Sequence, residues 1–111
     1  MSLDLHLTNV KYVKRLCGAL SSDSRIRILL LLSERELCIE DLSRALGTSK
    51  ANVSFHVKVL EEAGLVRCRY MPGVKGVKKI CWLAVDEVRI VLSKKFSDNP
   101  SSAVDSGGYS S

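Results

Sequence analysis

Apolar side chains recur at helical spacing along residues 53–60. Val53, Val57 and Leu60 fall at i, i+4 and i+7, so they form one stripe that has to pack against the rest of the chain. The opposite face is small, polar and cationic, without the alternating acidic and basic residues of an ordinary solvated helix. The outward residues are Lys50, Ala51, Ser54, Phe55 and Lys58. This pattern predicts a helix over 49–63 with one buried face and one contact face.

Three further segments upstream have helical patterns. Residues 3–20 carry apolar positions at helical spacing, and the serine-rich stretch 21–24 then breaks the pattern and offers caps for the next helix. Residues 25–32, "RIRILLLL", are apolar nearly all round toward their end and predict a central buried helix, although the same run alone also fits a strand. Residues 40–46 predict a short helix with acidic residues in its first turn, and Gly47 is its expected stop.

The spacing of the last two predicted helices is the most specific feature of the pattern. The helix over 40–46 is followed by only "GTS", whose last residue, Ser49, already opens the helix over 49–63. Such a separation is typical of a helix-turn-helix, in which the N-terminal half of the second helix enters the DNA major groove. Gly47 permits the reversal of the chain, and Thr48 or Ser49 is the expected cap of the second helix.

Strand-like segments follow the second of these helices. "LVRCRY" and "KKICWLAV" flank "MPGVKGV", whose proline and glycines predict a turn. With the turn centred between Val74 and Lys75, opposed residues have numbers that sum to 149, which places Cys68 opposite Cys81. A basic hairpin next to a helix-turn-helix predicts a wing. The expected fold is therefore mainly α with a small β-hairpin wing, a winged helix-turn-helix.

Length and charge are consistent with one basic domain. The 111 residues have a net charge of +5 and a pI of about 9.2, which favours a polyanionic partner. We expect a folded domain over 1–96 and a disordered Ser/Gly-rich tail over 97–111. No stretch approaches the ~18 apolar residues that span a bilayer, and the start has no signal-peptide core. These features predict a cytoplasmic protein without a membrane partner.

Several motifs resemble those of one protein family. "LSSDSRIRILLLL", "ELCIEDLSRALGTSKANVSFHVKVLEEAGLV" and the following hairpin, roughly residues 16–85, are similar to the ArsR family of winged-helix transcription regulators. The match includes Ser54 and His56 of an S-x-H-L-x-x-L motif, in which Val57 replaces the more usual Leu. The resemblance implies a homodimer, built from the first and last helices, that binds an imperfect palindrome in double-stranded DNA and usually represses.

Metal sensing is common in that family, but the ligands differ here. Cys38 matches the first cysteine of the family's sensor motif, whereas Glu40 and Ser43 stand where further cysteines would be. A soft thiolate site needs more than one thiol. The other common site uses Asp and His pairs on the last helix, and residues 86–96 contain no His. We therefore predict no metal site and no cofactor.

The resemblance and the exposed face together assign roles to residues. The expected base-edge contacts are Lys50, Ala51, Ser54 and Phe55. The expected phosphate contacts are Lys58, Arg69, Lys75, Lys78 and Lys79. We interpret His56 as a packing or phosphate-contacting residue, not as a ligand or a catalytic base. Phe55 either contacts a thymine methyl group or covers a neighbouring helix.

Unburied apolar faces predict how two copies meet. The first helix and residues 86–96, interpreted as the last helix, have apolar positions that a chain of this length cannot fully bury alone. These positions are Val10, Val13, Leu16, Val88, Val91 and Leu92.

Alternatives to DNA binding remain at this stage. A winged helix can instead be a protein-interaction module of the transcription machinery. An enzyme with a cysteine nucleophile needs a suitably placed histidine, and the only histidines are His6 and His56, so we predict no enzymatic activity. For Cys68 and Cys81, the favoured interpretation is a pair of small apolar residues in a reducing compartment. The alternative is a pair that oxidation links, with an effect on the wing.

Overall fold

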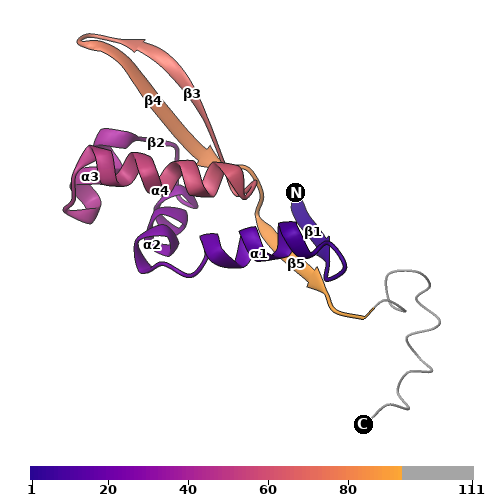
Figure 1. Cartoon of the computed structure of the whole chain (residues 1–111). Helices are drawn as coiled ribbons and strands as arrows, with labels where there is room; N and C mark the ends of the chain where they lie inside the picture. Colours follow the sequence, from indigo (N-terminus) through magenta and orange to yellow (C-terminus); the bar gives the residue numbers. More distant parts are fainter. Residues whose placement is uncertain (94–111) are drawn as a thin grey trace.

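The structure, a computed structural model, describes residues 1–93. Within this range a helical body carries a projecting hairpin, and a small parallel sheet joins the two ends (Figure 1). The helices are α1 (Val10–Ala19), α2 (Asp23–Leu32), α3 (Ile39–Leu46) and α4 (Lys50–Glu62). The strands are β1 (Ser2–His6), β2 (Leu37–Cys38), β3 (Val66–Gly73), β4 (Gly76–Leu83) and β5 (Glu87–Val91). The winged helix-turn-helix is confirmed; the predicted tail over 97–111 lies outside the described residues.

Local signals set the ends of the helix-turn-helix. Gly47 ends α3 with φ of 70°, a left-handed conformation that glycine adopts without the strain of a side chain. The Ser49 hydroxyl accepts a hydrogen bond from the Asn52 N–H at 3.1 Å and caps α4. Of the two caps that the sequence predicts, Thr48 or Ser49, the structure uses Ser49.

The buried face of α4 lies at the centre of the core. Val53, Val57 and Leu60 are fully buried, as their spacing predicts. They belong to one apolar cluster with Ile28 of α2 and Leu42 of α3, which are also fully buried. Burying these side chains removes apolar surface from water and fixes α4 on the body. Its other face is consequently turned to solvent.

The wing has the register that the sequence predicts. In the antiparallel pair β3–β4, Cys68 lies opposite Cys81 and the turn falls between Gly73 and Gly76. The short strand β2 pairs with the other edge of β4, where Leu37 lies opposite Cys81. This third strand attaches the root of the hairpin to the body, and the far end of the hairpin projects beside α3 and α4 (Figure 1).

Two helix predictions are wrong at the ends of the described chain. Residues 2–6 form β1, so the first helix starts only at Val10. Residues 87–91, which we interpreted as part of the last helix, form β5 and pair in parallel with β1. The sequence "EVRIV" alternates charged and β-branched residues, a pattern that fits a half-buried strand. Leu3 and Val88 lie opposite each other and pack against the core.

The predicted dimer face is also partly wrong. Val13 and Leu16 are 9% and 1% exposed and belong to the interior of a single chain. Val88 packs against the core as well. Val10 and Leu92 remain 60% and 70% exposed. Only the exposed part of the predicted face is available to a second copy.

Candidate nucleic-acid interface

The outward face of α4 presents the residues that the sequence predicts. Lys50, Ala51, Ser54, Phe55 and Lys58 are all exposed. The Phe55 side chain is 58% exposed, so most of its ring is uncovered by the rest of the chain. Its described aromatic contact is with the neighbouring His56 ring, at 5.5 Å between centroids. The apolar ring is therefore available to a partner.

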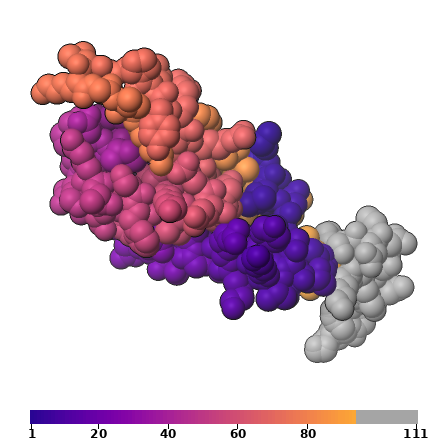
Figure 2. Space-filling model, turned by 45° about the horizontal axis from the view of Figure 1, so that its top comes forward, coloured from indigo at the N-terminus to yellow at the C-terminus, as the bar shows by residue number. Residues whose placement is uncertain are grey.

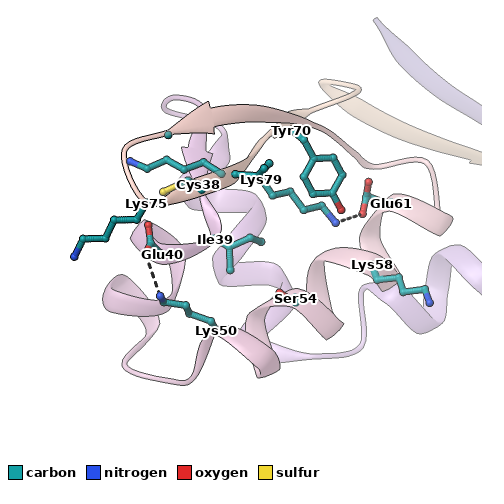
Figure 3. A pocket seen from close by; sticks show the side chains of 14 residues that line it. Cys38, Ile39, Glu40, Lys50, Ser54, Lys58, Glu61, Tyr70, Lys75 and Lys79 are labelled. Carbon is teal, nitrogen blue, oxygen red and sulfur yellow. Dashed lines mark hydrogen bonds and ion pairs between the residues drawn. The ribbon is translucent and has the colours of Figure 1, made fainter.

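A groove with a volume of about 750 Å³ runs between the wing and the helix-turn-helix. Residues from α3 and α4 form one side, and residues of β3, β4 and their turn form the other (Figure 3). In the space-filling view the hairpin overhangs the helices (Figure 2). The groove brings together the lysines Lys50, Lys58, Lys75, Lys78 and Lys79. Ser54 of α4 also lines it.

Two of these lysines are held by carboxylates of the same chain. Lys50 Nζ donates to Glu40 of α3 at 3.0 Å, and this bond together with the lysine charge lowers the pKa of Glu40. Lys79 Nζ donates to Glu61 of α4 at 3.0 Å. Burial alone would lower the pKa of Lys79, but the bond and charge of Glu61 outweigh it and raise that pKa. The second pair joins the wing directly to α4 (Figure 3).

The other groove lysines are unpaired in the part of the chain that the structure describes. Lys58, Lys75 and Lys78 form no ion pair within residues 1–93. Lys58 comes from α4, whereas Lys75 and Lys78 come from the far end of the wing. Cations on both sides of one groove favour an extended anion over a single small one.

Arg69 lies apart from the groove. It lies opposite Ile80 in the register and is not among the residues that line the groove. Its guanidinium lies 5.2 Å from the centre of the Trp82 ring and 3.6 Å from Glu36. The structure therefore separates Arg69 from the other cations that the sequence grouped with it.

His56 also lies outside the groove, between α4 and α2. Its Nδ1 is 2.9 Å from Nη1 of Arg25. Because a guanidinium only donates, the imidazole accepts at Nδ1 and is neutral. Burial, followed by the charge of Arg25, lowers the pKa of His56. The packing interpretation of His56 fits these contacts, and a phosphate contact by the same residue stays a prediction.

Sequence reasoning missed three residues that shape the groove. Glu40, Glu61 and Tyr70 line it, and Lys79 Nζ lies 5.8 Å from the centre of the Tyr70 ring. The hairpin register contained a signal for Tyr70, because the numbers of Tyr70 and Lys79 also sum to 149. The ion pairs of the two glutamates join separate elements, and no periodicity predicts them.

Cys38, which also lines the groove, makes a hydrogen bond to Asp41 of α3. The Cys38 thiol is buried and donates to a carboxylate oxygen of Asp41 at 3.2 Å. This hydrogen bond is the main cause of the lowered pKa of Asp41.

Among residues 1–93 no three His, Cys, Asp or Glu side chains converge as metal ligands would. In the same range, every helix is too short or too polar to cross a bilayer.

Residues 22–67 match the model of the family described as "Bacterial regulatory protein, arsR family". A CadC homolog from Staphylococcus aureus, a cadmium resistance transcriptional regulatory protein, is 36% identical over 67 residues, which are 60% of this chain and 55% of that protein. The arsenical resistance operon repressor of Escherichia coli is 46% identical over 48 residues, 42% of this chain and 41% of the repressor. The chain thus spans about half the length of these curated relatives.

A solved structure extends the likeness to the fold. The homodimeric winged helix-turn-helix DNA-binding domain (fragment 1–100) from Mycobacterium bovis, a possible ArsR-family transcriptional regulator, superposes with a TM-score of 0.61 at 27% identity. The match covers 70% of this chain and 68% of that domain.

Proposed function

We propose, from the match of residues 22–67 to the arsR-family model, that the protein is a sequence-specific transcription regulator, a repressor that binds a palindromic operator as a homodimer. The observation that carries the proposal is the exposed face of α4 next to a groove with lysines on both sides. A DNA duplex presents base edges in its major groove, which α4 can contact, and rows of phosphates, which the lysines can contact.

The roles of individual residues follow from their positions. Lys50, Ala51, Ser54 and Phe55 are exposed on the first two turns of α4, where a recognition helix meets base edges. The wing lysines and Lys58 contact phosphates, which supplies affinity that depends on salt. To contact DNA, Lys50 and Lys79 have to break their ion pairs with Glu40 and Glu61. Their net contribution to DNA affinity is therefore smaller than that of the unpaired lysines.

The homodimer of the proposal uses the exposed remainder of the predicted face. Val10 of α1 and Leu92 after β5 are exposed apolar side chains, and Tyr12 of α1 is 52% exposed. Apolar surface that a single chain leaves in water is a frequent site of self-association. The Mycobacterium bovis domain is homodimeric, which supports a homodimer but does not by itself locate its interface. Two copies about a two-fold axis would present two α4 helices to two half-sites.

The second candidate is a protein-interaction module. It is favoured by apolar side chains on the wing, where Tyr70 is 70% and Val77 70% exposed and Val74 at the turn is fully exposed. Such a cluster is unusual on a surface that only contacts phosphates. This alternative predicts weak DNA binding that is lost at ordinary salt and shows no preference for sequence.

Selection of DNA by the pure protein distinguishes the two candidates. A library of random duplexes is bound at about 0.15 M salt, and the retained fraction is sequenced after several rounds. The proposal predicts an enriched inverted repeat that a Ser54→Ala, Lys50→Ala variant enriches less strongly. An Arg27→Ala variant, altered at an exposed position of α2, serves as the control. Retained DNA without any enriched sequence would exclude the regulator and leave the interaction module.

A further inference from the structure

Two thiols meet at the root of the wing. Cys68 and Cys81 lie directly opposite each other in the register, and their Sγ atoms are 2.8 Å apart. The Ala84 N–H donates to the Leu65 carbonyl at 2.9 Å. Since the ladder alternates every residue, this bond makes Cys68 and Cys81 a non-hydrogen-bonded pair, with Cα atoms about 4.5 Å apart. That separation lies in the range that disulfides span, about 4.4–6.8 Å.

The two sulfurs differ in accessibility. Cys68 is partly exposed, whereas Cys81 is fully buried. The remaining thiols are separate from them: Cys17 is exposed on α1, and the buried Cys38 bonds to Asp41. An oxidant from solvent therefore reaches one member of the pair, and the other lies in position to complete a bond.

We propose that Cys68 and Cys81 form a modification site, a dithiol that a peroxide converts into an intramolecular disulfide, and that this bond changes the affinity of the wing for DNA. The second part rests on the proposed function. Nothing in the family match assigns this pair, because β4 lies outside residues 22–67.

The chemistry balances with the peroxide as the only oxidant. The Cys68 thiolate attacks one peroxide oxygen, the O–O bond breaks, and a sulfenic acid and one water result. The Cys81 sulfur then attacks the Cys68 sulfur; the S–S bond forms, the S–O bond breaks, and a second water leaves. Two thiols are oxidised, one peroxide is reduced, and the thiol protons end in water. Burial raises the pKa of both thiols, so the reaction accelerates as pH rises.

The position of the pair couples it to the groove. The next pair on the same face, two residues toward the turn, is Tyr70 with Lys79. Lys79 is the wing residue that bonds to Glu61 of α4 at 3.0 Å. A covalent bond between the cysteines fixes the spacing and twist of the strands next to this contact. The wing lysines beyond it then shift relative to α4.

The test uses the full chain with Cys17→Ser, which removes the exposed thiol that could link two molecules. The protein is treated with hydrogen peroxide, unfolded and alkylated. Its mass is then measured by mass spectrometry before and after treatment with dithiothreitol. The expected product is a chain that is not covalently linked to a second chain, has two fewer free thiols and regains them on reduction. A proteolytic digest should contain a disulfide-linked peptide that joins residues 68 and 81. Affinity for a selected duplex should differ by about threefold or more between the two forms.

Two variants in the Cys17→Ser background provide the controls. Cys38→Ser keeps both Cys68 and Cys81 and should form the same disulfide between them. Cys68→Ser removes the reactive partner, so its DNA affinity should not respond to the same treatment. Persistent free thiols at positions 68 and 81 would overturn the site, and equal DNA affinity of the linked and unlinked chains would overturn its effect. Failure of the reduced protein to bind DNA would refute the proposed function, while the mass measurement would still test the dithiol.

Discussion

Arg25 and His56 join α2 to α4, with 2.9 Å between Arg25 Nη1 and His56 Nδ1. The same guanidinium donates from Nε to the Ala19 carbonyl at 2.9 Å and from Nη2 to the Gly18 carbonyl at 3.2 Å. One side chain thus connects the end of α1, the start of α2 and the middle of α4. Since α4 carries the candidate base contacts and α1 the candidate dimer contacts, Arg25 sets their relative position.

Replacing Arg25 with Lys tests this connection. The charge is kept, but an ammonium group lacks the planar fork that reaches three acceptors at once. We expect a loss of about 1–3 kcal/mol in the free energy of unfolding, from hydrogen bonds to a charged donor. Urea unfolding followed by circular dichroism measures it. Arg27→Lys, at an exposed position on the same helix, should change stability little; equal losses in both variants would contradict the role of Arg25.

His56 predicts a pH dependence of stability. Burial and then the Arg25 charge lower its pKa in the folded protein below the ordinary 6.5. As pH falls, the unfolded chain therefore binds the proton first. The contribution of His56 is fully present above about pH 6.5 and is lost as pH falls through the folded-state pKa. The urea midpoint of the wild type should drop between about pH 7.5 and about pH 5 by more than that of His56→Asn, whose amide can still accept but does not titrate.

His6 remains in both proteins, so the difference between the two pH profiles isolates His56. Parallel profiles would show that His56 does not couple protonation to folding.

The sequence predicted the fold where local rules and burial agree. The apolar period of α4, the left-handed stop at Gly47 and the register of the wing are properties of short stretches, and the structure confirms them. Residues 87–91 were interpreted wrongly because the family resemblance implied a helix, while their β-branched alternation fits a strand. That strand forms only because β1, more than eighty residues away, lies beside it, and a segment on its own cannot reveal such pairing.

The exposed residues of α4 and the wing lysines were predictable from the sequence, but the separate position of Arg69 and the charge pairing of the lysines were not. Exposure of the lysines on α4 follows from the helical period. The bond from Lys50 to Glu40 joins two helices, and the bond from Lys79 to Glu61 joins a strand to a helix. These contacts depend on how the elements pack in three dimensions, so no spacing in the sequence indicates them.

The Lys79–Glu61 pair leads to a prediction about affinity. Glu61→Gln removes a negative charge from the groove and releases Lys79. Solvent-exposed ion pairs contribute about 0–1 kcal/mol to the free energy of unfolding. Because this pair is only partly exposed, its loss should lower the free energy of unfolding by an amount at the upper end of that range, about 1 kcal/mol. DNA affinity should rise for all sequences, most strongly at low salt. Glu62→Gln, an exposed neighbour outside the groove, is the matched control; a decrease in affinity of Glu61→Gln would contradict the phosphate role of Lys79.

Dimer formation is tested with side chains that the monomer does not need. Val10→Asp combined with Leu92→Asp places charges on exposed apolar positions. We expect a folded monomer by sedimentation velocity and circular dichroism, with reduced affinity for an inverted repeat. Val13→Asp should instead unfold the chain, because Val13 is buried in the core. A double variant that still sediments as a dimer would place the interface elsewhere.

The salt dependence of DNA affinity, measured for a selected duplex and a random duplex, separates sequence readout by α4 from phosphate binding by the wing. Lys78→Ala should weaken both duplexes alike and reduce the slope of log K against log salt by about one. Ser54→Ala with Lys50→Ala should mainly weaken the selected duplex, by about 1–3 kcal/mol for each base edge that α4 no longer reaches. If α4 reads base edges and the wing binds phosphates, the two variants should differ in this way. Equal affinity of the wild type for both duplexes, with no change on removal of Lys78, would contradict these roles.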